Sequence, residues 1–223
     1  MNFRDRLQRC FKPRFAVIYP FGIFVTVFCY LNEYFLKSSI ILIVIGVALR
    51  LWANSYAIKN DKLTTSGPYA FVRNPLYLGT FFIAIGFIFV LTTAVPWWEN
   101  IAGGMFLLAL CLMYYRTINT EEGMLREKFK DAFSDYCQHV PALIPTFIPY
   151  KKGEKWPFSF KKLSQSKEYK VAFWIFVILT AFYLKTHLLI EHKNFDKKCW
   201  DLATAALFFI ILDATLEFNK KNS

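Results

Sequence analysis

Long apolar runs, most of them close to the length of a membrane-spanning helix, alternate with short polar segments along this chain. The runs cover residues 15–36, 39–58, 76–95, 101–115, 171–190 and 202–216. A helix needs about 20 mostly apolar residues to cross the hydrocarbon core of a bilayer. The pattern therefore predicts an all-α fold, a polytopic membrane helical bundle with about six transmembrane helices.

A different pattern covers residues 117–139. Apolar side chains recur there every three to four residues, with charged residues between them: Leu125, Phe129, Phe133 and then Tyr136 or Cys137. This period predicts a cytoplasmic amphipathic helix on the membrane surface, which continues or kinks from the fourth span. Asn119 and Glu122 have the spacing of a capping box, so one interpretation of Glu121 and Glu122 is that they cap this helix. Residues 140–149 contain three prolines and are expected to be extended.

The ends of the spans leave alternatives open. Only residues 37–38 separate the first two runs, which predicts a tight hairpin. Arg50, near the end of the second run, either extends to the cytoplasmic interface or faces a cavity. The last run is short and contains Asp213, with Glu217 just after it, so the final pair of helices is either two full spans or a shallow hairpin.

The charge of the chain fits a membrane protein. The 223 residues are 56% hydrophobic and carry a formal net charge of +11, with the basic residues gathered between the apolar runs. We interpret this charge as membrane topology and contact with anionic lipid, because no nucleic-acid-binding motif accompanies it. Basic flanks mark the cytoplasmic ends of spans, so the N-terminus and the loops after the second and fourth spans are expected in the cytoplasm.

Three parts are expected along the chain. Residues 1–150 form a membrane core of four spans, a polar loop and the amphipathic helix. Residues 151–170 form a basic cytoplasmic linker, and residues 171–223 form a C-terminal helical pair to which the sequence assigns no role.

The cysteines and histidines form no pattern typical of a cofactor site. The five cysteines include no CxxC pair, and the three histidines are dispersed. We therefore expect free thiols, with no disulfide framework and no metal site.

Residues 67–79, GPYAFVRNPLYLG, form the longest run of turn residues and polar groups between the apolar runs. Pro68 and Pro75 bias the residues before them away from the helical region, so the run is expected to be a structured loop leading into the third span. It contains one fixed charge, one amide and two phenols: Arg73, Asn74, Tyr69 and Tyr77. A polar loop before a helix N-terminus suits an anionic or zwitterionic ligand. The alternative is a simple turn with interfacial Tyr and Arg.

The loops after the second and fourth spans lie on one membrane face and are able to meet. Together they offer Arg73, the adjacent carboxylates of Glu121 and Glu122, and several aromatic rings. S-adenosylmethionine suits this set, because carboxylates bind its ribose hydroxyls or ammonium, Arg binds its carboxylate, and aromatic faces favour its sulfonium. Other nucleotides fit the same groups.

Two blocks of sequence carry a resemblance to a known family. The first is TSGPYAFVRNPLYLG, and the second is EE followed by L-x3-F-x6-Y and VPALIP. Together they resemble the integral-membrane methyltransferases that include isoprenylcysteine carboxyl methyltransferases and phospholipid methyltransferases, over roughly residues 50–145. The resemblance implies S-adenosylmethionine as cofactor, entering from the cytosol. It also implies a lipid or lipidated acceptor, such as an isoprenylcysteine carboxylate or a phospholipid amine, that arrives from within the bilayer.

The resemblance also implies the residues of the site. Those expected to be catalytic are Arg73, Glu121 and Glu122. Those expected to bind the cofactor are Tyr69, Arg73, Asn74, Tyr77, Gly79, Glu121, Glu122 and Tyr136. A carboxylate acceptor needs no general base, whereas an ammonium acceptor must first lose a proton, for which Glu121 or Glu122 is the candidate base.

Four positions depart from the family pattern. Asn74 stands where the isoprenylcysteine enzymes have His, Phe133 where Tyr is common, and Lys130 where Gly is common. Ala142 stands where a basic residue often follows Val-Pro, which leaves the cofactor carboxylate to Arg73 or Arg116.

Two other functions compete with methyl transfer. NADPH-dependent membrane sterol reductases share a similar R-x-P-x-Y loop and a Tyr-Cys…Val-Pro ending, but they have more helices before the motif than this chain holds. A catalytically inactive lipid-binding membrane protein that kept the fold is the second alternative. The choice of cofactor separates the two enzyme classes.

Overall fold

A computed structural model describes residues 13–56, 62–93, 96–153, 155, 157–166 and 168–222. The chain divides into two compact units, Met1–Phe158 and Ser159–Ser223. The basic segment over residues 1–12, which carries most of the predicted N-terminal charge, lies outside the described residues.

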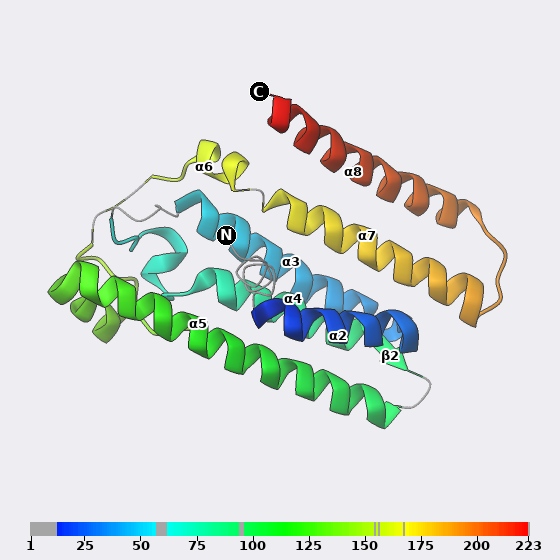
Figure 1. Cartoon of the computed structure of the whole chain (residues 1–223), viewed down its shortest axis with the longest axis horizontal. Coiled ribbons are helices and arrows are strands. Elements are labelled where there is room, and N and C mark those ends of the chain that lie inside the picture. The colour runs from blue at the N-terminus through cyan, green and yellow to red at the C-terminus, as the bar shows by residue number, and fades with distance from the viewer. Residues whose placement is uncertain are drawn as a thin grey trace, which may run out of the picture. The chain divides into compact units, whose positions relative to one another are not determined.

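In the part of the first unit that the structure describes, four helices predominate (Figure 1). They are α2 (Pro13–Phe28), α3 (Glu33–Tyr56), α4 (Pro75–Val90) and α5 (Pro96–His139), joined by a short 3-10 helix, η1 (Gly67–Ala70), and two three-residue strands, β1 (Cys29–Leu31) and β2 (Leu91–Thr93). The prediction of an all-α membrane-type fold is confirmed.

The predicted junction between the first two spans is wrong. The first helix ends at Phe28 and the second begins at Glu33, because Cys29–Leu31 pairs antiparallel with Leu91–Thr93 instead of continuing the helix. Asn32 closes the turn, since its N–H donates to the carbonyl of Val90 over 2.7 Å and its side chain accepts the N–H of Tyr34 over 3.0 Å. The same pairing ends α4 at Val90, before the predicted end at residue 95.

Small residues bring α3 and α4 into close contact. A Cβ on Gly46 would lie 2.5 Å from the carbonyl oxygen of Gly79, and a Cβ on Gly79 would lie 2.7 Å from that of Gly46. Backbones approach this closely in membrane bundles where both helices present small residues. The contact also sets Arg50 against Gly79, whose added Cβ would lie 2.7 Å from Arg50 Cγ.

α5 contains both the predicted fourth span and the predicted amphipathic helix. The helix continues through residues 115–117, where it was expected either to continue or to kink, and is interrupted further on at Lys130, whose φ of 43° and ψ of −116° are not helical. This is the position where the family resemblance leads us to expect Gly, the residue that tolerates positive φ. The capping box at Asn119 is wrong, because the helix runs through that residue and does not begin there.

Four described helical stretches are long and apolar enough to cross a membrane: Glu33–Tyr56, Asn100–His139, Tyr169–Ile190 and Lys197–Phe218. Two further apolar helices, Tyr19–Phe28 and Pro75–Val90, are shorter. The total of six spans therefore stays a prediction.

The second unit contains α6 (Phe160–Gln165), α7 (Tyr169–Lys185) with a π-helical turn η2 (Thr186–Ile190), and α8 (Lys197–Asn222). The rings of Phe173 and Phe209 stack between α7 and α8, with centroids 4.7 Å apart. The two acidic residues near the end do not shorten the last helix, because Lys170 pairs with Asp213 at 2.5 Å and with Glu217 at 2.7 Å. Both helices are long and apolar enough to cross a membrane, and the choice between two full spans and a shallow hairpin stays a prediction.

Candidate functional site

A cavity of about 1030 Å³ lies within the first unit. Its wall combines the end of α3, the loop around η1, the first turns of α4 and residues 113–136 of α5. Small-molecule sites commonly measure about 300–1000 Å³, so this cavity is large enough for a nucleotide-sized ligand. Seven of the eight predicted site residues line it: Tyr69, Arg73, Asn74, Tyr77, Glu121, Glu122 and Tyr136.

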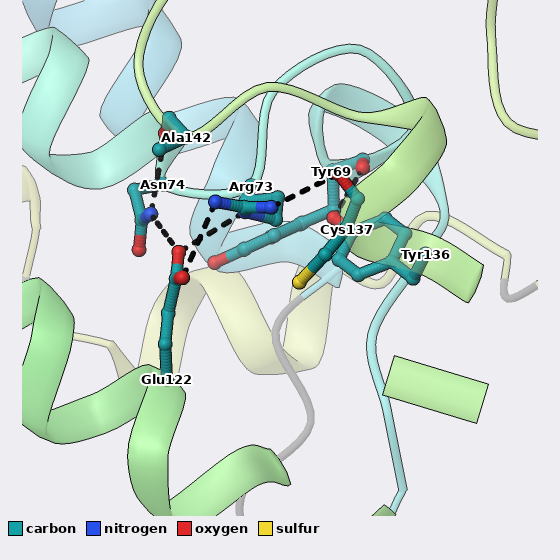
Figure 2. A network of polar contacts seen from close by, with 7 residues as sticks. All are labelled: Tyr69, Arg73, Asn74, Glu122, Tyr136, Cys137 and Ala142. Carbon is teal, nitrogen blue, oxygen red and sulfur yellow. Dashed lines mark hydrogen bonds and ion pairs between the residues drawn. The ribbon is translucent and has the colours of Figure 1, made fainter. Parts of the chain in front are cut away.

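Arg73 joins the loop to α5 (Figure 2). Its Nε lies 3.0 Å from Oε1 of Glu122, and its Nη2 donates to Oε2 of the same carboxylate over 3.2 Å. Its Nη1 donates to the carbonyl of Cys137 over 3.2 Å, in the last turn of α5, where carbonyls lack partners within the helix. Both side chains of the ion pair are 16% exposed, so water screens the pair less than it would on the surface.

Asn74 connects the same carboxylate to the proline-containing segment. Figure 2 shows its side-chain amide between Glu122 and Ala142. Nδ2 donates to Oε1 of Glu122 over 3.4 Å and to the carbonyl of Ala142 over 3.2 Å. The backbone N–H of Asn74 donates to the same carbonyl over 3.1 Å. Ala142 therefore supplies a backbone acceptor where the family often has a basic side chain.

Residues 140–150 run alongside the loop and are held to it by backbone hydrogen bonds. The N–H of Arg73 donates to the carbonyl of Pro141 over 2.9 Å, and that of Thr146 donates to Phe71 over 2.9 Å. Proline lacks a donor but keeps its carbonyl, so this segment can accept from the loop without forming a helix. The prediction that the loop and the segment after the fourth span meet is confirmed.

Glu121 lies in a different environment from its neighbour. Its Oε1 accepts a hydrogen bond from the hydroxyl of Tyr77 over 2.8 Å, and within the described residues this is its one hydrogen bond. The ring of Tyr77 packs against Tyr114, with centroids 4.7 Å apart. Both oxygens of Glu122 contact Arg73, whereas Arg73 has no such contact with Glu121 among the described residues, although both glutamates line the cavity.

Tyr136 fastens the loop from the end of α5. Its hydroxyl donates to the carbonyl of Tyr69 over 2.6 Å, and its ring is buried with Phe133 and Val140. Phe133 is 1% exposed, so the residue that departs from the family pattern fills the core here with no hydroxyl to pair.

Tyr150 packs against this cluster from the proline-containing segment and donates to Asp135 over 2.8 Å. Burial, followed by that hydrogen bond, raises the pKa of Tyr150 to about 12. The phenol therefore stays protonated and keeps donating at neutral pH.

Arg50 faces the cavity, which decides between its two alternatives. Its Nη1 donates to Oγ1 of Thr80 over 2.6 Å and to the carbonyl of Leu76 over 3.3 Å, and the residue is part of the cavity wall. Gly79 is the one predicted site residue that does not line the cavity, because it lies in the contact between α3 and α4. Arg116 is exposed and does not line it either.

Several residues of the wall were not predicted. Lys62, Thr64, Tyr114, Thr117 and Lys128 all line the cavity. The sequence does contain a signal for some of them, because Tyr114, Thr117, Glu121 and Lys128 follow one another at three-, four- and seven-residue spacing and so share one face of α5.

Comparison with known proteins assigns the family. The family model for phospholipid methyltransferases matches residues 21–132, which include the loop over residues 67–79 and the two glutamates of α5 that line the cavity. This chain belongs to the phospholipid methyltransferase family. A methyltransferase family implies a methyl donor as co-substrate, and the apolar helices together with the family make this an integral membrane protein.

Curated relatives include two named methyltransferases and one metal-resistance protein. The chain is 33% identical over 118 residues to the cobalt-zinc-cadmium resistance protein CzcN of Cupriavidus metallidurans, covering 50% of this chain and 51% of that protein. It is 30% identical over 136 residues to the protein-S-isoprenylcysteine O-methyltransferase of Schizosaccharomyces pombe, covering 60% and 54%. The human protein-S-isoprenylcysteine O-methyltransferase is 28% identical over 130 residues, covering 53% and 42%. The chain thus spans about half the length of the curated relatives it matches. No solved structure matches it.

Proposed function

We propose that this protein is an integral-membrane methyltransferase that moves a methyl group from S-adenosylmethionine to a lipid or lipidated acceptor. The acceptor is of the isoprenylcysteine carboxylate or phospholipid amine type. The observation that carries the proposal is the cavity, because paired carboxylates, aromatic rings and cationic side chains converge there in the part of the chain that the family model matches.

The residues of the wall fit this cofactor. Tyr69, Tyr77 and Phe129 offer aromatic faces to a sulfonium, and Glu121 offers an oxygen to a hydroxyl or ammonium group. Arg73 is committed to Glu122, so the cationic groups suited to the cofactor carboxylate include Lys62 and Lys128. Bound in the cavity, S-adenosylmethionine would supply a sulfonium methyl that is already activated for transfer.

The protein's own contribution is then to position the reactants and exclude water. In our proposal Glu122 is a positioning residue. It holds the loop over residues 67–79 in place through Arg73 and Asn74, and this loop forms one side of the cavity wall. Glu121 is the residue that touches the ligand. For an amine acceptor it would remove the proton, with Tyr77 orienting the carboxylate, and for a carboxylate acceptor it would only bind.

We further propose that the N-terminus and the cofactor side of the cavity face the cytoplasm, with the acceptor entering from the bilayer. The basic residues gathered between the apolar runs support this orientation. The family match favours methyl transfer over the NADPH-dependent reductase alternative. Labelled methyl transfer separates it from an inactive lipid-binding protein.

The decisive experiment measures transfer of labelled methyl from S-adenosylmethionine into the lipid extract and the protein fraction of membranes. Membranes with the wild-type chain, Glu121→Gln and Glu127→Gln are compared. Glu127 is an exposed carboxylate of the same helix that does not line the cavity, so it is the matched control. We expect label with the wild type and the control, and its loss with Glu121→Gln. No label with the wild type, together with no binding of S-adenosylmethionine by the purified chain, would overturn the proposal.

A further inference from the structure

The turn between α7 and α8 brings together three side chains of types that bind transition metals. His187 comes from the π-helical turn η2, Asp196 from the residue before α8, and Cys199 from the first turn of α8. One ligand atom of each lies within 4.8 Å of the other two. We propose that these three residues bind a divalent transition-metal ion of the zinc type, at a site separate from the cavity of the first unit.

One pair of donor atoms lies near the spacing that such an ion requires, and all three lie within 4.8 Å of one another. Metal–ligand bonds of about 2.0–2.3 Å place tetrahedral ligands about 3.3–3.7 Å apart. Nε2 of His187 and Oδ2 of Asp196 are 3.8 Å apart. The Asp196 carboxylate can serve two purposes at once. Its Oδ1 accepts the N–H of Cys199 over 2.8 Å and so caps the start of α8, while its Oδ2 lies toward the imidazole of His187. Binding the ion therefore requires no loss of this helix cap.

The imidazole is held in the orientation that ligation needs. His187 is buried, and its ring stacks on Tyr183 at an interplanar angle of 17°. On the other side of the ring, Nδ1 lies 3.6 Å from a carboxylate oxygen of Glu191. A carboxylate behind the second ring nitrogen is typical of metal-binding histidines, because it orients the ring and strengthens its donor nitrogen. Nε2 also lies 3.2 Å from the carbonyl of Asn194, a contact that the imidazole would give up when Nε2 binds the ion.

The donor set and its exposure select the kind of ion. A thiolate, an imidazole and one carboxylate suit zinc, cobalt or cadmium and do not suit magnesium or calcium, which prefer oxygen ligands. Cys199 is fully buried and the Asp196 side chain is half exposed, so the ion would enter from the side of the carboxylate and keep a water as its fourth ligand. The sequence alone predicted no metal site, because the three residues follow no spacing that marks one.

The experiment uses the full chain, purified in detergent with any affinity tag removed, stripped with a chelator and titrated with Co²⁺. Cobalt bound to a thiolate produces a charge-transfer absorption band, and Zn²⁺ should abolish it at one equivalent per chain. Cys199→Ser should remove the band. Cys111→Ser is the matched control, because Cys111 is an exposed cysteine of α5, and it should leave the band unchanged.

Two milder variants separate ligation from folding. Asp196→Asn keeps a side chain that caps helices as well as Asp does, and should still weaken Zn²⁺ binding at least tenfold. Glu191→Gln should weaken it about 10- to 100-fold through its effect on the imidazole. A wild-type chain that shows no band, or a band that persists in Cys199→Ser, would overturn the proposal. None of these measurements depends on methyl transfer. The proposal of a metal site can therefore be refuted without affecting the proposed function.

Discussion

The ion pair between Arg73 and Glu122 is the contact that we expect to hold the cavity wall together. With 3.0 Å between Nε and Oε1, its gross Coulomb energy is about 5.5 kcal/mol at an effective dielectric constant of about 20. Each partner is 16% exposed, and the cost of removing both charges from water offsets a large part of that energy. We therefore expect a net coupling of about 2 kcal/mol, above the ~0–1 kcal/mol typical of a surface pair.

Glu122→Gln tests this value because it removes the charge and keeps the shape of the side chain. In a chain of this size a destabilisation of about 1 kcal/mol lowers the midpoint of thermal unfolding by about 2–4 °C. We therefore expect the midpoint of Glu122→Gln to be about 4–8 °C lower than that of the wild type, as measured in detergent by tryptophan fluorescence. Arg73→Lys keeps the charge but lacks the planar group that contacts both carboxylate oxygens. Glu127→Gln, on the same helix, should leave the midpoint unchanged.

The double variant decides whether the two residues act as a pair. If they do, Arg73→Gln combined with Glu122→Gln should cost about 2 kcal/mol less than the sum of these two single changes, because each of them removes the ion pair. Strict additivity would mean that the two side chains contribute independently, and the assignment of Glu122 to positioning the loop would be refuted.

Three further predictions follow from single positions. Lys130→Gly should raise the unfolding midpoint by about 2–12 °C, because the positive φ costs a residue with a side chain about 1–3 kcal/mol. Glu127→Gly, in the regular part of the helix, should lower the midpoint. Gly46→Ala should destabilise the chain by about 1–3 kcal/mol in the same assay, while Gly104→Ala, whose added Cβ meets nothing within 4 Å, should be neutral or slightly stabilising. Tyr77→Phe removes a hydroxyl that donates to a carboxylate over 2.8 Å, and should reduce methyl transfer about tenfold. An unchanged rate would show that this hydrogen bond does not orient a reacting group.

The sequence predicted the helices but not where the first two meet. The length of an apolar run is a local property of the sequence, and it correctly indicated a helix on each side of residues 29–32. The turn itself depends on pairing between Cys29–Leu31 and Leu91–Thr93, about 60 positions apart, which no local pattern reveals. Residues 37–38 were predicted to connect two helices, but Lys37 lies inside α3. The polar residues there only interrupt the apolar run within a single helix.

The candidate site divides in the same way. The family resemblance indicated the residue types, and seven of the eight predicted residues line one cavity. The sequence could not predict which of these residues contact one another. Arg73 and Glu122 are 49 positions apart, and the hydrogen bond between them depends on the kink and the end of α5. Gly79 shows the opposite error, since a conspicuous glycine in the motif lies in the contact between helices and not in the wall.

The two adjacent glutamates illustrate why geometry must precede the assignment of roles. Consecutive residues of a helix point about 100° apart, so Glu121 and Glu122 cannot face the same partner. Glu122 contacts the loop and is held by Arg73 and Asn74, whereas the one side-chain hydrogen bond of Glu121 within the described residues comes from the hydroxyl of Tyr77. Both oxygens of Glu122 are already engaged by Arg73, so turning this carboxylate toward a ligand would break the contacts that hold the loop. If the acceptor is an amine, we therefore propose that Glu121 is the residue that removes its proton. Loss of activity in Glu121→Gln should then occur without the decrease in midpoint expected of Glu122→Gln.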